Sequence, residues 1–253
     1  MIGYDKIAEH SGILLDLPFY EGIGIITRDQ AKPHHQDVLL INTPTWERAQ
    51  TGEYEFSNAF DWGFDSGIGI GVITLDGANE YLELDNAASL DLDFMASDYS
   101  IGVWIYWTTG MPSQIIIGRY QLDVGGWELY LFDDPNYYLS LRHHHAATFV
   151  PPVTGNPRSS CYSSQWVKNT WHFVGISRSG ATVIHHRNGV ALTTTGTLVD
   201  PETCALDLVI GVRFNKTNNY FKGSIWRPRV WNRALSASEW LNIFNRERHF
   251  FGV

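Results

Sequence analysis

Residues 221–240 read FKGSIWRPRVWNRALSASEW, and this stretch contains a strand signal followed directly by a helix signal. The first half is rich in Ile, Val and Trp, which are residues typical of β-strands. Ser236 and Glu239 then form an S-x-x-E capping box, which marks the N-terminus of a helix. The stretch therefore predicts a strand that leads into a short helix.

The residues after the capping box continue the helix signal. Trp240, Ile243 and Phe244 recur at helical spacing, so they form one apolar stripe. Gly252 follows at a point where a helix could end. We expect one C-terminal helix whose apolar stripe packs against a sheet.

The rest of the chain contains short strand-like segments with no further helix between them. Each is rich in β-branched and aromatic residues and is bounded by Gly, Pro, Asn or Asp. Asn188-Gly189 is a preferred type I′ turn and predicts a hairpin. The segments cover residues 12–19, 23–29, 37–42, 71–77, 80–85, 100–108, 114–120, 127–134, 137–143, 171–177, 181–186, 190–196, 206–214 and 221–232. The pattern predicts an all-β fold in one domain, a two-sheet antiparallel sandwich with one short C-terminal helix.

The order of these segments resembles the laminin-G-like jelly roll of the concanavalin A-like lectin/glucanase superfamily. The segments that carry the resemblance are LDLPFYEGIG, ITLDGANEYLELDNAASLDL, YSIGVWIYWT, NTWHFVGIS, the RNGV hairpin, LVIGV and the 221–240 stretch. The resemblance implies a jelly roll over 12–253, preceded by an N-terminal arm at 1–11. Residues 47–68 are longer than the family usually carries there, so we expect an inserted hairpin or loop.

Composition and charge exclude several classes of function. The net charge of -9 offers no basic surface for nucleic acid, and we expect no nucleic-acid partner. No apolar run approaches the roughly 20 residues of a membrane-spanning helix, and we expect no membrane insertion. The start, MIGYDKIAEHSG, is not a secretory signal. Cys161 and Cys204 lack metal-site spacing. They could form a disulfide in a protein that works outside a cell, but we expect two unpaired thiols.

Glu83 and Asp85 raise the question of catalysis because they share one face of a predicted strand. The resemblance implies that catalytic relatives carry a third carboxylate two or three residues further on. This chain has Ala87 and Ala88 there, so the acid/base group is missing. We expect a protein that is not an enzyme, in which this stretch is structural.

Carboxylates in predicted loops are candidates for a metal ion. Many relatives bind calcium at a loop rim, and Asp133, Asp134 and Asp29 are the best oxygen ligands for it here. The Asp-Asp-Pro-Asn sequence is also good turn chemistry, which we favour. No other cofactor is expected.

Histidines cluster at the end of the predicted strand 137–143. His143 and His145 share one face and could bind a metal if a third ligand approached, but a half-buried strand end is the favoured interpretation. Tyr138, Arg142 and His144 share the other face and are candidate ligand-binding or interface residues.

Tryptophans are the largest surplus in the composition. We assign Trp104, Trp171, Trp226 and Trp231, which lie inside predicted strands, to the core. Tryptophans at strand ends are candidates for sugar stacking or for a protein interface. We expect at least two of these four to be exposed: Trp46, Trp107, Trp127 and Trp166.

Two classes of function follow from these features. We expect a non-catalytic recognition or structural module, in the first place a phage or virus virion component such as a capsid decoration, tail or fibre protein. A chain that starts at Met1 without a secretory signal favours the virion. The alternative is a carbohydrate-binding module of an extracellular or cell-surface system. Its partners would be a glycan or neighbouring protein subunits, in a homo-oligomer or larger assembly.

Overall fold

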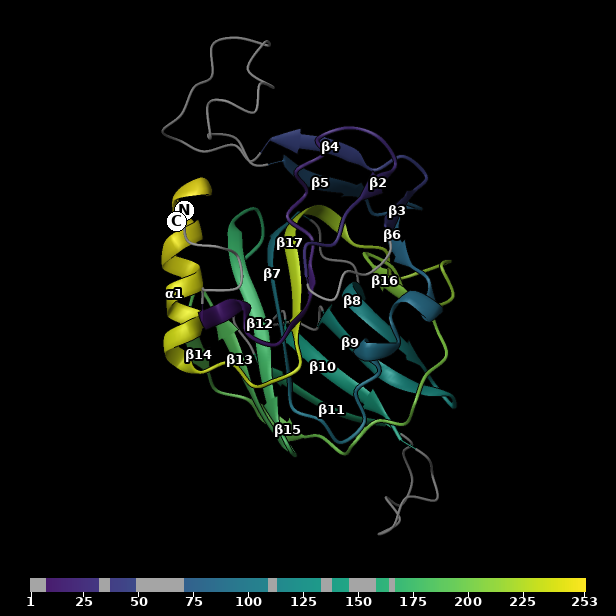
Figure 1. Cartoon of the computed structure of the whole chain (residues 1–253), viewed down its shortest axis with the longest axis vertical. Coiled ribbons are helices and arrows are strands. Elements are labelled where there is room, and N and C mark those ends of the chain that lie inside the picture. The colour runs from purple at the N-terminus through teal and green to yellow at the C-terminus, as the bar shows by residue number, and fades with distance from the viewer. Residues whose placement is uncertain are drawn as a thin grey trace.

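The fold is a sandwich of two antiparallel sheets with one α-helix on the outside (Figure 1). It is seen in a computed structural model that describes residues 8–31, 37–48, 71–108, 113–132, 138–145, 158–163 and 167–253. The predicted all-β class and the single C-terminal helix are confirmed. Among the described residues, no helix combines the length and the apolar character needed to cross a bilayer.

The first sheet, sheet A, contains eight strands. In spatial order they are β14 (Val190–Leu192), β13 (Thr182–Arg187), β12 (Trp171–Ser179), β7 (Tyr99–Trp107), β17 (Lys222–Trp231), β5 (Gly71–Asp76) and β4 (Thr45–Arg48), with β1 (Ile13–Asp16) also paired to β17. The predicted hairpin between β13 and β14 is confirmed, because Asn188 and Gly189 have φ values of 51° and 77°.

The second sheet, sheet B, contains nine strands. In order they are β15 (Thr195–Thr197), β11 (Arg158–Ser163), β10 (Tyr138–His144), β9 (Gly125–Phe132), β8 (Ser113–Gln121), β16 (Leu208–Ile210), β6 (Tyr81–Leu84), β3 (Val38–Ile41) and β2 (Ile26–Thr27). Alternate residues of the central strands point into the core between the sheets, as a period of two requires. Leu129 and Leu131 of β9 and Leu139 and Leu141 of β10 are core residues of this kind.

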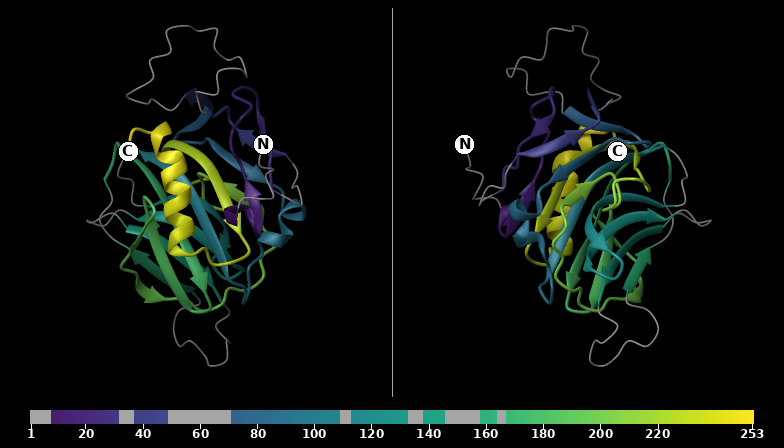
Figure 2. Two further views of the ribbon diagram at one scale, coloured as in Figure 1. Left: turned by 60° about the vertical axis from the view of Figure 1, so that its left-hand side comes forward. Right: turned by 90° about the vertical axis from the view of Figure 1, so that its right-hand side faces the viewer.

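The outer face of sheet A is covered by the C-terminal helix α1 (Ala237–Glu247), which lies across the strands in Figure 2. The predicted capping box is present, because Ser236 accepts from the Glu239 amide and Glu239 accepts from the Ser236 amide. Trp240 is fully buried and its ring stacks 4.5 Å from that of His186. A 3-10 turn, η5 (Arg248–Phe250), continues the helix before Gly252.

The tryptophans assigned to the core are buried, as expected: Trp104, Trp171, Trp226 and Trp231. Phe251, just after η5, contacts three of these rings, with centroid distances of 4.2 Å to Trp104, 4.4 Å to Trp171 and 5.4 Å to Trp226. The outer face of sheet A is therefore a second apolar layer, and it is closed by α1 and the segment that follows it.

The described part of the predicted N-terminal arm lies against this layer. The 3-10 turn η2 (Ala8–His10) carries the Glu9 carbonyl, which accepts a 2.6 Å hydrogen bond from Trp231 Nε1. Residues 1–7 lie outside the described residues. Of the expected insertion at 47–68, residues 47 and 48 belong to β4 and the remainder also lies outside them. Cys161 and Cys204 are buried, and both thiols are free in this structure.

Two further short 3-10 turns follow β6. They are η3 (Asn86–Ala88) and η4 (Leu90–Leu92). Leu92 is buried, and its carbonyl accepts a hydrogen bond of 2.8 Å from Trp127 Nε1. These turns join the edge region of sheet B to the core.

Candidate functional site

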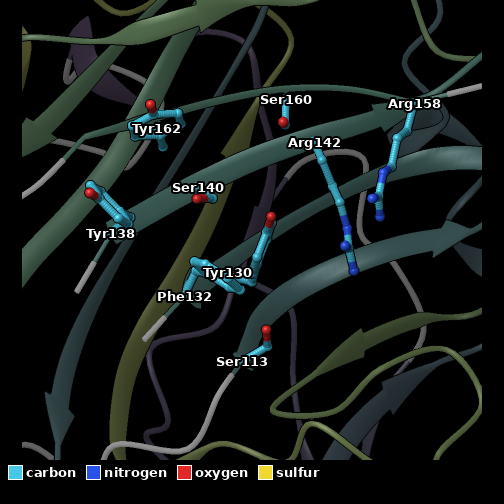
Figure 3. Close-up of a pocket in the computed structure, with 9 residues that line it drawn as sticks. All are labelled: Ser113, Tyr130, Phe132, Tyr138, Ser140, Arg142, Arg158, Ser160 and Tyr162. Carbon is cyan, nitrogen blue, oxygen red and sulfur yellow. The ribbon is translucent and has the colours of Figure 1, made fainter. Parts of the chain in front are cut away.

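The outer face of sheet B carries a groove across strands β8 to β11 (Figure 3). Its volume is about 460 Å³, which is within the size range of small-molecule sites. Its lining consists of Ser113, Tyr130, Phe132, Tyr138, Ser140, Arg142, Arg158, Ser160 and Tyr162. The helix α1 covers sheet A on the opposite side of the sandwich, so it does not cover this groove.

Strand pairing aligns the lining residues in rows that run across the sheet. Residues directly opposite each other in neighbouring strands share a face and lie close together. One row is Ser113, Phe132 and Tyr138, the next is Ile115, Tyr130, Ser140 and Tyr162, and the third is Gly118, Glu128, Arg142 and Ser160. The first two rows are rich in aromatic residues and the third is charged, so the groove has an aromatic end and a charged end.

The aromatic end presents exposed ring surface. Phe132 and Tyr162 are 37% and 38% exposed. The rings of Tyr138 and Tyr162 meet edge to face, with centroids 4.8 Å apart. Tyr130 lies deeper, and its burial raises the pKa of its hydroxyl, which therefore stays protonated at neutral pH. Serines at positions 113, 140 and 160 add hydroxyl groups between the rings.

The charged end is organised around the ion pair between Arg142 and Glu128. The Arg142 guanidinium lies between two aromatic rings, 4.5 Å from the Tyr120 centroid and 4.6 Å from that of Tyr130. Burial alone would lower the pKa of Arg142, but the facing Glu128 carboxylate and the tyrosines more than offset this, so its pKa is raised. Arg142 is thus a fixed, charged donor in the groove wall.

Gly118 of β8 makes room for this ion pair. A Cβ atom at position 118 would lie 2.9 Å from the Cα and Cβ atoms of Glu128. A side chain there would displace Glu128, so the glycine is required for the close packing of β8 against β9.

Arg158 provides the second cationic group of the groove. It lies on β11, is exposed, and pairs in register with His144 of β10. In Figure 3 the Arg142 and Arg158 side chains extend in the same direction at one end of the groove. The two guanidiniums come from adjacent strands and share one face of the sheet.

Two of the residues predicted from the sequence, Tyr138 and Arg142, are brought together in this groove. His144 lies on the same face but is 3% exposed and does not line the groove. Its Nε2 accepts a hydrogen bond of 2.8 Å from the Asp123 amide. Tyr130, Phe132, Arg158 and Tyr162 were not predicted from the sequence, because only the pairing of β10 with β9 and β11 shows that they share a face with Tyr138.

The expectation that strand-end tryptophans are exposed is wrong for Trp107 and Trp127, which are 2% and 0% exposed. Both point inward because they continue the core-facing alternation of their strands, Trp107 with Ile105 and Trp127 with Leu129. Trp46 is partly buried, and its Nε1 donates to the Gly24 carbonyl at 2.8 Å. Trp166 lies outside the described residues.

Glu83 and Asp85 have structural partners. Glu83 forms a 2.7 Å ion pair with Lys216, which also contacts Asp207 at 3.0 Å. The Asp85 side chain accepts from the Ala87 amide at 2.8 Å and caps η3. This bonding agrees with the structural interpretation of the stretch.

Of the three candidate calcium ligands, Asp29 is the one that lies within the described residues. Asp29 is buried, and its Oδ1 accepts backbone amide hydrogen bonds from Asp16 at 2.8 Å and Ala31 at 2.9 Å. Asp133 and Asp134 lie outside the described residues. Within the described ranges, no three His, Cys, Asp or Glu side chains form a group that could hold a metal ion.

His143 and His145 are both buried. His143 contacts the Tyr99 hydroxyl at 2.6 Å and the Val199 carbonyl at 2.9 Å, which accounts for both ring nitrogens. Its ring therefore packs in the core below β10, and the strand end is more deeply buried than the half-buried end that we expected.

Comparison with known proteins first identifies a family. The model of the concanavalin A-like lectin/glucanases superfamily matches residues 76–239. No curated protein sequence matches the chain. The matched range contains β6 to β17 and all of the groove strands.

Several solved structures share this fold, and toxin binding domains are among them. The binding domain of botulinum neurotoxin serotype G matches with a TM-score of 0.64 and 13% identity, covering 93% of this chain and 51% of that one. Domain 4 of a GH43 extracellular arabinanase from Geobacillus stearothermophilus, in complex with arabinotriose, has a TM-score of 0.60 and 15% identity, covering 91% and 97%. The binding domain of Paraclostridial Mosquitocidal Protein 1 has a TM-score of 0.64 and 12% identity, covering 96% and 56%. The chain thus spans about half the length of the toxin domains and nearly all of the arabinanase domain.

Proposed function

This chain belongs to the concanavalin A-like lectin/glucanases superfamily, and from that premise we propose that it is a carbohydrate-binding module whose saccharide ligand lies in the groove of sheet B. The proposal includes no catalytic step. The groove is the binding surface, and the sandwich is the rigid support that holds its side chains in place.

The observation that carries the proposal is the combination of groups in the groove. Sugar rings pack their C–H groups against aromatic faces, while polar side chains bind the hydroxyl groups. Tyr138, Tyr162 and Phe132 supply the aromatic surface, and the serines and arginines between and beside them supply hydrogen bonds. Because these residues lie on paired strands, little ordering is needed when a ligand binds.

Solved structures with the same fold also support carbohydrate binding as the function. One of them is an arabinanase domain solved in complex with arabinotriose. Another is botulinum neurotoxin type C, whose cell entry is dependent upon interaction with two ganglioside molecules, with a TM-score of 0.57 and 13% identity. Fold likeness at this identity does not transfer a ligand, so the saccharide and its position are argued from the groove itself.

The positions of the carboxylates support a non-catalytic role. A glycosidase needs two carboxyl groups across the scissile bond. Among the described residues that line the groove there is no Asp or Glu, and the nearby Glu128 is held by Arg142. Glu83 and Asp85 lie on or after β6, several strands from β9 and β10, and have structural partners.

The virion role expected from the sequence has no support in the groove or in the reported relatives, which favour the carbohydrate-binding alternative. It stays a prediction. Binding to a second copy or another protein through the same groove would be an outcome of the experiment that follows.

The first prediction tests the aromatic end of the groove. Wild-type protein and the Tyr138→Ala and Tyr162→Ala variants are compared on a glycan array, and hits are then titrated by calorimetry. We expect the wild type to bind at least one class of oligosaccharide. Each alanine variant should bind it about fivefold or more weakly, because stacking of a sugar on one aromatic ring is worth on the order of 1 kcal/mol.

Tyr20→Ala is the matched control, since Tyr20 is 63% exposed and is not a groove residue. It should bind like the wild type. Loss of affinity in the groove variants with unchanged thermal unfolding supports the proposal. Absence of saccharide binding by the wild type, or equal binding by all four proteins, contradicts it.

A further inference from the structure

We infer that the ligand of the groove is an anionic saccharide, with a carboxylate or sulfate group bound by Arg142 and Arg158 at the charged end. This inference rests on the proposed function and adds the chemical class of the ligand. Both candidate groups are oxyanions, and guanidinium groups bind oxyanions through paired, charge-assisted hydrogen bonds.

The first argument is the placement of the two arginines. Arg142 is opposite Ser160 on β11, and Arg158 lies two residues before Ser160 on that strand, so the arginines are diagonal neighbours on one face. Both line the groove. Their tips lie at the same end in Figure 3, away from Tyr138 and Tyr162. A saccharide that stacks on the aromatic end would place its next substituent near the guanidiniums.

The second argument is the state of the Arg142 side chain. It is 7% exposed, yet its Nε is a buried donor with no hydrogen-bond partner among the described residues. Leaving a buried donor unpaired costs about 1–3 kcal/mol. The rings of Tyr120 and Tyr130 hold the guanidinium at the groove wall, so it is already positioned for an acceptor that enters the groove.

The third argument is the local balance of charge. The guanidiniums of Arg142 and Arg158 and the carboxylate of Glu128 act on Tyr130, and the guanidinium of Arg213 interacts with Glu128 and Tyr130. Among these described groups positive charge exceeds negative charge, in a chain whose net charge is -9. A binding face that is more cationic than the rest of an acidic protein is complementary to an anion.

The overall acidity also predicts how such a ligand is held. A chain of net charge -9 does not attract polyanions over long distances. Selectivity must therefore come from direct contacts within the groove. We expect short anionic oligosaccharides to bind, with Arg158 as the group whose removal affects them most selectively, since it is exposed and its removal leaves the buried Arg142–Glu128 ion pair in place.

The test uses pairs of oligosaccharides that differ only in charge. One pair is a galacturonate oligosaccharide and its methyl ester, which removes the carboxylate charge. The other pair is a sulfated galactose oligosaccharide and its desulfated form. Affinities are measured by calorimetry for the wild type, Arg158→Gln, and the control Arg28→Gln, whose arginine side chain is 71% exposed and is not a groove residue.

We expect the wild type to prefer the charged member of at least one pair by about tenfold, and the pair that shows the preference identifies carboxylate or sulfate. Arg158→Gln should reduce that preference at least fivefold and leave the affinity for the neutral member unchanged. Arg28→Gln should behave like the wild type.

A second variant addresses Arg142 without leaving a buried charge unpaired. The double substitution Glu128→Gln and Arg142→Gln removes both charges and keeps polar side chains at both positions. It should also abolish the preference for the anionic member. If it folds like the wild type and keeps the preference, Arg142 is not a ligand-binding group.

The two proposals fail in different ways. Equal binding of charged and neutral members, unchanged by Arg158→Gln but weakened by Tyr162→Ala, overturns the anionic ligand and retains the carbohydrate-binding function. Absence of binding to every member of both pairs overturns the anionic ligand, and the glycan array then decides the carbohydrate-binding function separately.

Discussion

Individual residues determine how closely the helix α1 approaches sheet A. Gly102 of β7 and Gly175 of β12 lie opposite each other under the Trp240 ring. A Cβ atom at Gly175 would be 2.3 Å from that ring and 2.1 Å from the Ile101 carbonyl oxygen. The glycines therefore form the floor of the site into which the tryptophan packs.

The prediction at this scale concerns Gly175. We expect Gly175→Ala to lower the free energy of unfolding by about 3 kcal/mol, because the added methyl group overpacks a site that has no space. Gly180→Ala is the control. Nothing lies within 4 Å of a Cβ at Gly180, but its φ is +57°, so it should cost only about 1 kcal/mol of backbone strain. Urea unfolding measures both. Equal losses would mean that the Trp240 site tolerates an extra atom.

At the scale of elements, α1 is joined to the sheet by both apolar and ionic contacts. Glu247, near its C-terminus, is buried and accepts hydrogen bonds from Arg229 at 2.8 and 2.7 Å, Arg227 at 3.0 Å and Trp104 at 2.8 Å. The capping box at Ser236 defines the other end. The helix is thus defined locally at its N-terminus and by tertiary contacts along its length.

This division of roles predicts unequal effects of two substitutions. Ser236→Ala removes the cap and should lower the free energy of unfolding by about 1 kcal/mol. Trp240→Ala leaves a cavity between α1 and sheet A and should lower it by about 3–5 kcal/mol. Chemical denaturation of both variants checks this. Small and equal effects would show that the helix contributes little to the stability of the sandwich.

Across the whole molecule, buried histidines from both sheets make stability depend on pH. Burial lowers the pKa of His143 in sheet B to about 3, and in sheet A it lowers that of His185 to about 3 and that of His186 to about 4. In the unfolded chain histidine has a pKa of about 6.5. The folded state therefore keeps these rings neutral over a range in which the unfolded state binds protons.

The sign of the effect follows from this difference. The contribution of the neutral histidines to the free energy of unfolding is fully present above pH 6.5. It is lost as the pH falls below 6.5, by about 1.4 kcal/mol per pH unit for each histidine, until the folded-state pKa of that histidine is reached. At pH 5 we expect a loss of about 2 kcal/mol per histidine relative to pH 7.5. Urea unfolding at the two pH values tests this, and His143→Gln should show a smaller difference. An unchanged free energy of unfolding would mean that the rings are solvated.

Local sequence patterns predicted most of the secondary structure and two residues of the groove. β-branched and aromatic runs predicted the strands, Asn188-Gly189 the hairpin, and Ser236 with Glu239 the helix start, since each of these depends on neighbours within a few residues. The shared face of Tyr138 and Arg142 followed from the period of two along one strand.

Tertiary structure alone decided which residues form the groove and which tryptophans are exposed. Tyr162 and Arg158 meet Tyr138 and Arg142 only because β11 pairs with β10 in one register, and that pairing joins segments separated by a long connection. Trp107 and Trp127 stand next to loops in the sequence, but the facing sheet buries them. Local patterns determine the secondary structure because its forces act between near neighbours. Burial and binding surfaces depend on which distant strands pack together, and no single segment contains that information.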